Sequence, residues 1–233
     1  MHGYVILYNL VLLVIGYLIG SFNIALFISK RKLKEDIRDK GSGNAGATNG
    51  LRVYGKKIGL TILLFDFFKS YIPILIIGLL ARFLEPVGEN WFYNNYIIPQ
   101  SIGLGVVIGH IFPIYHNFRG GKGASCFAGL ITSINITLFI IGLILFIAMV
   151  YITKIVSISV ISVTLVLSGL AFIPWIATGS PLAELNKSVK ECFWLIGIVS
   201  CLSYIFVLIA HRQNIIRLVK GQENSFKKKQ PEN

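Results

Sequence analysis

The stretch 109–123 combines glycines, histidines, an arginine and a lysine between two apolar segments. It reads Gly-His-Ile-Phe-Pro-Ile-Tyr-His-Asn-Phe-Arg-Gly-Gly-Lys-Gly, which is too polar for an ordinary hydrophobic hairpin. Glycines let backbone N–H groups converge on an anion, Lys122 adds a full charge, and a helix that begins after Gly123 would direct its positive dipole end at the same point. The stretch therefore favours phosphate binding. The alternative is a basic cytoplasmic loop that only orients the chain in a membrane.

Other clusters along the chain are also rich in hydrogen-bond donors and poor in acidic residues. Stretch 41–52 contains glycines that permit unusual backbone angles, together with polar side chains and an arginine. Stretch 153–159 places hydroxyls near a helix start, and His211 and Asn214 share one helix face. Taken singly, these clusters fit a flexible connection or serines that hydrogen-bond to their own helix. Together they favour one site for more than one phosphate.

Asp66 and Lys69 are ionisable groups inside an apolar segment, where such groups are costly and are usually paired or functional. Their i, i+3 spacing lets them neutralise each other on one helix face, so we expect a structural pair that supports the site. His110 lies on the apolar side of its turn and is expected to be a packed, hydrogen-bonded histidine rather than a catalyst.

The elements that hold these clusters are predicted to span a membrane. The chain has 233 residues, of which 55% are hydrophobic and 14% charged, and its mean hydropathy is +0.72. This composition excludes an ordinary soluble protein. The net charge of +12 lies in short connections between apolar runs, which indicates membrane orientation rather than a nucleic-acid partner. Cys126, Cys192 and Cys201 lie in or beside apolar segments without metal-ligand spacing, so we expect no disulfide, metal or other cofactor.

Charges in the connections predict the orientation. The run at 4–27 reads as a retained span, and the basic loop after it places the N-terminus outside. The basic tail at 211–233, with Lys227–Lys229, is predicted to be cytoplasmic, which demands an odd number of spans. Simple hydropathy gives an even number. We therefore divide the run at 124–153 into two spans, because Thr132, Ser133 and Asn135 interrupt it.

The sequence thus predicts an all-α, polytopic integral membrane protein with seven transmembrane helices in a single domain, 1–233. The span at 124–131 is far shorter than the roughly 20 residues that cross a bilayer core, so it must be shielded by other helices or lie in a thinned region. The connections at 82–95 and 178–191 are expected to face outside. The predicted spans are 4–27, 58–80, 97–115, 124–131, the rest of the run to 153, 159–176 and 192–209.

In order and spacing, the clusters resemble those of the acyl-phosphate-dependent glycerol-3-phosphate acyltransferase family, the PlsY type of bacterial plasma-membrane enzyme. The resemblance covers nearly the whole chain, and the Gly-Ser-Gly-Asn and Gly-Gly-Lys-Gly loops are distinctive together. The chain departs from the family pattern at Ser70, Ser125-Cys126, Lys154 and Val160, which bears most on the cluster at 153–159. The matching residues are Gly41–Asn44, Gly46, Thr48, Asn49, Arg52, Asp66, Lys69, Gly109, His110, Phe112, Pro113, Phe118, Gly120–Gly123, Thr153, Val156, Ser157, Ser159, His211, Asn214, Ile215, Arg217, Leu218, Gly221 and Glu223.

The resemblance implies transfer of a fatty acyl group from acyl phosphate to the 1-hydroxyl of glycerol 3-phosphate, giving lysophosphatidic acid and phosphate. It implies a site on the cytoplasmic side of the bacterial plasma membrane, in an enzyme that works among membrane lipids, without metal or cofactor, as a monomer. The residues implied as catalytic are Ser42, Arg52, Lys122 and His211. The residues implied in substrate binding are Gly41, Gly43, Asn44, Thr48, Asn49, His110, Gly120, Gly121, Gly123, Ser157, Ser159, Asn214 and Glu223.

Acyl phosphate is an activated mixed anhydride, so such an enzyme must orient two phosphorylated reactants and stabilise charge rather than supply a covalent nucleophile. By the resemblance, Ser42 and Arg52 bind phosphate, and Lys122 with the amides of 120–123 holds the donor or leaving phosphate. Asp66 and Lys69 support the site.

The resemblance assigns the remaining polar groups to the second substrate. His211 and Asn214 would grip glycerol 3-phosphate, and Ser157 and Ser159 would hydrogen-bond to substrate oxygens. His211 is the best side chain by type to take the hydroxyl proton, and a substrate phosphate is the alternative.

Rival classes are weaker. Acyltransferases that use acyl-CoA or acyl carrier protein commonly carry a His-x4-Asp motif, and no histidine of this chain has an aspartate five positions on. An anion transporter would place its site near the bilayer midplane between internal repeats, and the sequence has no such repeat. A basic membrane adaptor would leave the glycine-rich motifs without a purpose.

Overall fold

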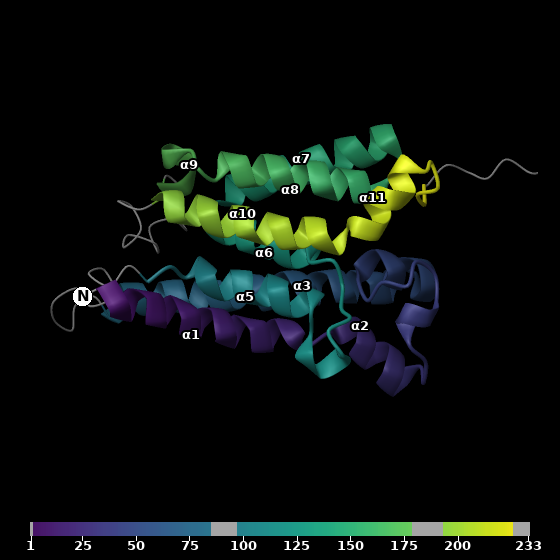
Figure 1. Ribbon diagram of the computed structural model, residues 1–233, viewed down its shortest axis with the longest axis horizontal. Coiled ribbons are helices and arrows are strands. Elements are labelled where there is room, and N and C mark those ends of the chain that lie inside the picture. Colours follow the sequence, from purple (N-terminus) through teal and green to yellow (C-terminus); the bar gives the residue numbers. More distant parts are fainter. Residues whose placement is uncertain (1, 85–96, 179–192, 226–233) are drawn as a thin grey trace, which may run out of the picture.

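The computed structural model describes residues 2–84, 97–178 and 193–225. Within these residues all regular secondary structure is helical, and loops connect the helices (Figure 1). The all-α prediction is therefore confirmed. The α-helices are α1 (His2–Ser21), α2 (Ile24–Phe27), α3 (Ala47–Leu84), α5 (Gln100–Ile111), α6 (Ala124–Ile134), α7 (Ile136–Thr153), α8 (Val156–Leu170), α9 (Pro174–Thr178), α10 (Phe193–Ala210) and α11 (Arg212–Val219). Single turns are the π-helix η1 (Ile28–Lys32) and the 3₁₀ helices η2 (Ile37–Asp39) and η4 (Ile114–His116).

Each predicted span contains a helix. The segments Ile6–Lys32, Ala47–Leu80, Ile136–Thr153 and Phe193–Ala210 are long and apolar enough to cross a membrane, and α6 and α8 are shorter apolar helices. The number of crossings and their orientation stay predictions. The predicted outer connections fall mostly at 85–96 and 179–192, and Lys227–Lys229 falls in 226–233, all of which lie outside the described residues.

The run at 124–153 is divided between α6 and α7, as predicted, and Asn135 makes the division. Its side-chain oxygen accepts a hydrogen bond from the Thr137 N–H at 2.7 Å and so caps α7. Its amide group donates to the Ile176 carbonyl at 2.8 Å. A buried asparagine that serves two backbone groups ends one helix and starts the next without leaving those groups unpaired.

The central helices α5 and α6 are short and deeply buried. Helix α5 has 12 residues and α6 has 11, so they are only about 18 and 16 Å long, against roughly 30 Å for a bilayer core. Most of their side chains are buried against α1, α3 and α10. Helix α5 ends at Ile111, short of the predicted 115, because Pro113 disfavours helical backbone at Phe112. The loop 112–123 therefore begins at the end of α5, and its middle part, 114–119, is mostly exposed.

Helices α1 and α5 pack through glycines spaced four apart on each helix. A Cβ atom at Gly16 or Gly20 would lie 2.0 or 2.2 Å from a carbonyl oxygen of α5. A Cβ at Gly105 or Gly109 would lie 2.1 Å from the carbonyl oxygen of Leu13 or Tyr17 on α1. Small residues at this spacing let two membrane helices approach backbone to backbone. This contact fixes α5, and with it the start of the loop 112–123.

The predicted span 159–176 is divided between α8 and α9, and α1 and α3 also differ from their predicted form. Helix α1 ends at Ser21, and the chain restarts at Asn23 as α2 and η1, whereas one helix was expected to 27. Helix α3 begins at Ala47 rather than near 58, and it breaks at Gly55, where φ is 83°. A Cβ at Gly59 would lie 2.7 Å from the Leu51 Cα, so the segment 47–54 folds back on the main part of α3. Residues 47–54 were predicted to be loop, and they are helix.

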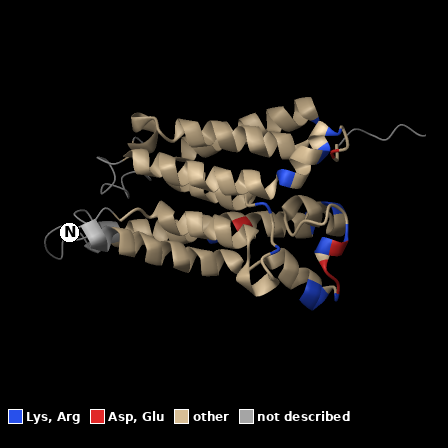
Figure 2. Cartoon of the chain, in the orientation of Figure 1, with Lys and Arg blue, Asp and Glu red and all other residues tan. Residues whose placement is uncertain are grey.

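Basic side chains gather at one end of the bundle, where α2 and α11 lie (Figure 2). The start of α1 lies at the opposite end from α11 (Figure 1). This arrangement is the one expected for an odd number of crossings with a basic cytoplasmic end.

We expect Gly105→Ala to destabilise the protein, because its methyl group meets the Leu13 carbonyl. The loss should be on the order of 1–3 kcal/mol, which is typical of overpacking. Gly169→Ala in α8 is the control, because a Cβ there has no neighbour within 4 Å among the described residues. It should leave stability unchanged or raise it by about 0.5–1 kcal/mol. Thermal unfolding in detergent measures both, and equal effects would contradict the packing account.

Candidate active site

A cavity of about 110 Å³ lies among the starts of α3, α6, α8 and α11. One water needs only about 10–15 Å³, so the cavity has room for a small polar molecule. The glycine-rich, lysine, serine and histidine clusters of the sequence all contribute to it. Its lining residues are Ser42, Asn44, Gly46, Ala47, Thr48, Arg52, Asp66, His110, Lys122, Gly123, Ala124, Ser125, Val156, Ser157, Val160, His211, Asn214, Glu223, Asn224 and Ser225.

The N-terminal turns of α3, α6, α8 and α11 all reach this cavity. Ala47 and Thr48 begin α3, Ala124 and Ser125 begin α6, and Val156 and Ser157 begin α8. Within the described residues, no side chain caps the starts of α6, α8 and α11, whose cap positions are Gly123, Ile155 and His211. The first N–H groups of a helix have no intrahelical partner and carry partial positive charge. The cavity is therefore built to receive anionic oxygens.

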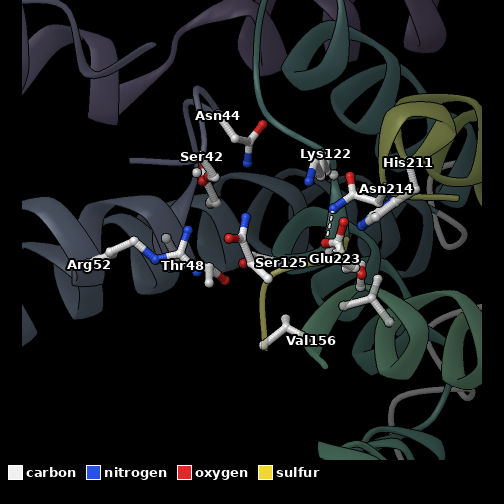
Figure 3. A pocket seen from close by; sticks show the side chains of 18 of the residues that line it. Ser42, Asn44, Thr48, Arg52, Lys122, Ser125, Val156, His211, Asn214 and Glu223 are labelled. Atoms are coloured by element: carbon white, nitrogen blue, oxygen red, sulfur yellow. Dashed lines mark hydrogen bonds between the residues drawn. The ribbon is translucent and has the colours of Figure 1, made fainter. Parts of the chain in front are cut away.

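The labelled side chains lie on two sides of the cavity (Figure 3). The Arg52 side consists of Ser42, Asn44, Thr48 and Arg52, and the Lys122 side consists of Lys122, His211, Asn214 and Glu223. The Arg52 side carries one basic group and several neutral polar groups, whereas the Lys122 side combines the Lys122 ammonium with a neutral histidine, an amide and the Glu223 carboxylate. Each side thus carries one basic group that can bind a phosphoryl group.

Burial governs the charge of Lys122. It lowers the pKa of Lys122 to about 8, the attraction of Glu223 opposes this shift, and the cations Arg217 and Arg52 add to it. Lys122 is therefore charged at pH 7 and close to titration. A bound anion would stabilise its charged form.

His211 is neutral at pH 7, because burial lowers its pKa to about 4. Its Nδ1 lies 2.8 Å from the Val207 carbonyl oxygen, which can only accept, so Nδ1 carries the proton. Nε2 is therefore the acceptor nitrogen. A neutral imidazole with a fixed tautomer at the edge of a cavity can accept a hydrogen bond from a hydroxyl group.

Glu223 links the Lys122 side to α8. Its carboxylate accepts hydrogen bonds from Ser157 Oγ at 3.0 Å, from Asn214 Nδ2 at 2.6 Å and from Arg217 Nε at 2.8 Å. Partial burial raises the pKa of Glu223, but these hydrogen bonds outweigh it and the net pKa is lowered. The ionised carboxylate therefore fixes the side chains of Ser157 and Asn214 at the cavity.

Asp66, Lys69 and His110 form a buried cluster beneath the cavity. Lys69 Nζ lies 2.9 Å from Asp66 Oδ1 and 3.0 Å from His110 Nδ1. The same ammonium group donates to the carbonyls of Gly20 and Phe22 at 3.2 and 3.1 Å, where α1 breaks. Lys69 thus provides hydrogen bonds for carbonyl groups at the C-terminal end of α1. Because Lys69 is in α3 and also contacts His110 of α5, it joins the three helices. The expected structural pair and hydrogen-bonded His110 are both present.

This cluster also contains the grouping best suited to a metal ion among the described residues, Asp66, His110 and Cys126. The Lys69 ammonium lies within hydrogen-bond distance of both Asp66 and His110 and already supplies the positive charge. The donor set therefore suits an internal ammonium better than a metal ion.

Several sequence-predicted residues do not line the cavity but shape its loops. Asn49 is buried, accepts a hydrogen bond from the Ser42 N–H at 2.8 Å and donates to the carbonyls of Ile37 and Lys40. A Cβ at Gly41 would lie 2.3 Å from Asn49 Oδ1. The amide group of Asn49 therefore holds the loop that presents Ser42. Gly43, next to this loop, also stays off the cavity wall.

The predicted phosphate contacts of Gly120 and Gly121 need correction. Their N–H groups donate to the carbonyls of Ile111 and His110 at 3.1 and 3.0 Å and are already occupied. Their missing side chains matter instead, because a Cβ at either would lie 2.0 Å from an atom of His110. Ser159 likewise donates to the Ile155 carbonyl within its own helix. Ser157, by contrast, points to Glu223 and the cavity.

Sequence reasoning missed Ser125, Val156, Val160, Asn224 and Ser225 as lining residues. Ser125 had a usable signal, since it lies in the first turn of the helix after the Gly-Gly-Lys-Gly loop. Asn224 and Ser225 had no such signal in the sequence. A glycine-containing turn after a short helix does not show that the following residues fold back to the cavity.

The comparisons with known proteins cover almost the whole chain. Residues 10–221 match the family model described as "Glycerol-3-phosphate acyltransferase". The chain is 43% identical to a glycerol-3-phosphate acyltransferase of Mycoplasmopsis agalactiae, over 96% of each protein. It is 39% identical to one of Mycoplasma mobile, over 94% of this chain and 92% of the relative.

The fold is similar to solved crystal structures of PlsY, an integral membrane glycerol 3-phosphate acyltransferase. The glycerol 3-phosphate form superposes with a TM-score of 0.72 at 28% identity, over 94% of this chain and 96% of the other. The lysophosphatidic acid form gives a TM-score of 0.71 at 27% identity, over 94% and 95%. Together with the apolar helices, this likeness confirms the predicted class of integral membrane protein.

The pKa of Lys122 predicts how anion binding depends on pH. Lys122 is charged below its pKa of about 8 and neutral above it, whereas sulfate stays a dianion throughout. We expect sulfate affinity to fall about tenfold between pH 7 and pH 9.5, in line with the loss of one charge-assisted hydrogen bond. Calorimetric titration at constant ionic strength measures this. Lys122→Arg, which stays charged, should show no such fall, and the same fall in both proteins would exclude Lys122 as its cause.

Proposed function

The chain belongs to the glycerol-3-phosphate acyltransferase family of the PlsY type, and on this premise we propose that it transfers a fatty acyl group from acyl phosphate to the 1-hydroxyl of glycerol 3-phosphate. The products are lysophosphatidic acid and inorganic phosphate, in the first acylation step of phospholipid synthesis. The observation that carries the proposal is the cavity in which Arg52, Lys122 and the starts of α3, α6, α8 and α11 meet. It offers places for two phosphorylated reactants.

The reaction needs orientation and charge stabilisation. The 1-hydroxyl oxygen attacks the acyl carbonyl carbon, the bond from that carbon to the phosphate oxygen breaks, and phosphate leaves with the electron pair. Negative charge develops on the carbonyl oxygen and then on the phosphate. Partnerless N–H groups at helix starts stabilise such charge without reorganising. Phosphate is a good leaving group, so a covalent acyl-enzyme intermediate is not required.

The two sides of the cavity bind different phosphoryl groups. Arg52 and Ser42 bind one phosphoryl group on the Arg52 side. Lys122, with Gly123 and the start of α6, binds the donor or leaving phosphate, and Ser157 contributes from the start of α8. His211 and Asn214 grip glycerol 3-phosphate. The geometry supports an orienting role for Glu223, because its carboxylate already accepts hydrogen bonds from Ser157, Asn214 and Arg217.

The hydroxyl proton has two possible acceptors. His211 Nε2 has the right tautomer, but its pKa of about 4 makes it a weak base at pH 7. The phosphate of a bound reactant has a second pKa of about 6 and is the stronger base. In either case His211 can accept a hydrogen bond from the hydroxyl and direct it.

The location of the cavity suits reactants that join a lipid tail to a polar head. Basic residues gather at the cavity end, which supports placing it on the cytoplasmic side of the bacterial plasma membrane. The functional monomer that the family resemblance implies stays a prediction. An anion transporter would be expected to hold its ligand near the bilayer midplane, between internal repeats.

Purified protein in detergent or lipid should make lysophosphatidic acid from acyl phosphate and glycerol 3-phosphate, without metal or acyl-CoA. Mass spectrometry of the product with each donor measures this. Activity with acyl-CoA alone would contradict the proposed donor.

Arg52→Ala and Lys57→Ala provide the matched pair for this assay. Both residues are exposed basic residues at the start of α3, but only Arg52 lines the cavity. Arg52→Ala should lower kcat/KM by at least about 100-fold, the order expected when one preorganised stabilising group is lost. Lys57→Ala should behave as wild type. Equal activity of the two variants would remove Arg52 from the site.

A further inference from the structure

Arg38 lies in η2, outside the cavity; it belongs to one loop and contacts a second. The first loop is 33–46, which presents Ser42, and the second loop is 112–123, which presents Lys122. The Arg38 guanidinium forms a two-pronged pair with Asp36, from Nε to Oδ1 at 3.0 Å and from NH2 to Oδ2 at 2.7 Å. Its remaining nitrogen, NH1, donates to the carbonyls of His116 and Arg119 at 3.2 and 3.0 Å. The contacts with the second loop span about eighty positions of sequence.

The part of the second loop that Arg38 holds is strained. Asn117 and Phe118 both have a positive φ of 56°, which is unfavourable for residues other than glycine. Such a residue persists only where its surroundings impose its conformation. The two carbonyls that Arg38 binds lie directly before and after these residues. Arg38 therefore stabilises the strained turn from both ends.

On its other side, Arg38 is fixed to the first loop. Asp36 Oδ1 accepts a hydrogen bond from the Arg38 N–H at 2.9 Å, and Lys30 Nζ lies 3.3 Å from Asp36 Oδ2. Ile37 is fully buried, and its carbonyl accepts a hydrogen bond from Asn49. Asn49 in turn accepts from the Ser42 N–H. A continuous chain of contacts therefore connects Arg38, through Ile37 and Asn49, to Ser42 on the Arg52 side.

The second loop continues from Arg119 directly into the Lys122 side. Gly120 and Gly121 follow Arg119 and are paired with the carbonyls of Ile111 and His110, so only a short, tethered segment separates the Arg38 contact from Lys122. Lys122 follows immediately. The Arg38 guanidinium thus connects the Arg52 side to the Lys122 side by contacts that lie outside the cavity.

We propose that Arg38 is a positioning residue that sets the separation of the Arg52 side and the Lys122 side. Among the described residues, none of its hydrogen-bond partners lines the cavity, so its effect is on how the two phosphoryl sites face each other. The partner geometry requires an arginine, because one planar group must meet a carboxylate on one edge and backbone carbonyls on another. The hydrogen bonds from Arg38 also lower the pKa of Asp36, so the pair stays ionised over the working pH range.

The kinetic test rests on the proposed acyltransfer and compares Arg38→Ala, Arg38→Lys and Lys32→Ala. Lys32 is an exposed cation on the neighbouring η1, so its removal changes the charge equally without touching either loop contact. We expect Arg38→Ala to lower kcat by about 10- to 100-fold, since a misplacement of about 1 Å costs that much, while KM for each substrate changes by less than about threefold. Arg38→Lys should be nearly as impaired, and Lys32→Ala should match wild type.

Two controls separate positioning from misfolding. The stoichiometry of sulfate binding measures the fraction of protein molecules that have a folded site. The kcat of each variant is then divided by this fraction. Hydrogen exchange at residues 113–121 should become faster in Arg38→Ala, whereas exchange in α5 and α6 should not change. A kcat that falls only in proportion to the folded fraction would overturn the proposal, and so would full activity of Arg38→Lys or unchanged exchange in the second loop.

Failure of the proposed function has a different outcome. A wild-type protein that binds sulfate but makes no lysophosphatidic acid would overturn the acyltransfer assignment. In that case the exchange measurement still tests whether Arg38 holds the second loop. An active wild type with a fully active Arg38→Ala would overturn only the positioning role.

Discussion

The structure depends on the starts of α6, α8 and α11, where among the described residues no side chain caps the first N–H groups and where residues of each start line one cavity. Helix starts carry partial positive charge, and bringing several together without side-chain caps is unfavourable unless an anion can join them. Lys122 and Arg52 add full charges to the same space, and the charge of Arg52 contributes to the lowered pKa of Lys122. This end of the bundle is therefore a preorganised receptor for negative charge. Burial lowers the pKa of Lys122 most, and the neighbouring cations Arg217 and Arg52 lower it further.

The rest of the bundle keeps these helix starts in place. Close glycine packing joins α1 to α5, and the buried Lys69 ammonium ties the break after α1 to α3 and His110. Removing one member of a buried ionic cluster leaves its partner charged and unpaired, which typically costs several kcal/mol. Short central helices α5 and α6 leave space for the loop 112–123 at the basic end. Stability and site geometry are therefore supplied by the same contacts.

Much of this was accessible from the sequence. Apolar runs and the polar interruption at Asn135 predicted the helices, and the sparsity of acidic residues around the glycine loops predicted an anion site. Spacing did not reveal that the amides of Gly120 and Gly121 are used within their own loop, because that depends on where Ile111 ends α5. The helix at 47–54 was missed because glycines and asparagines favour loops by local preference, whereas packing of Leu51 on Gly59 overrides it. Arg38 could not be recognised at all, since its partners His116 and Arg119 are distant in sequence.

The central claim is that a single cavity holds two tetrahedral anions, one on the Arg52 side and one on the Lys122 side. Selenate mimics sulfate and phosphate and is located directly by its anomalous scattering in a crystal. The account predicts two selenate positions within the cavity, one beside Arg52 and Ser42 and one beside Lys122 and the start of α6. Selenate bound only elsewhere on the protein, or a cavity that admits a single anion at saturation, would contradict it.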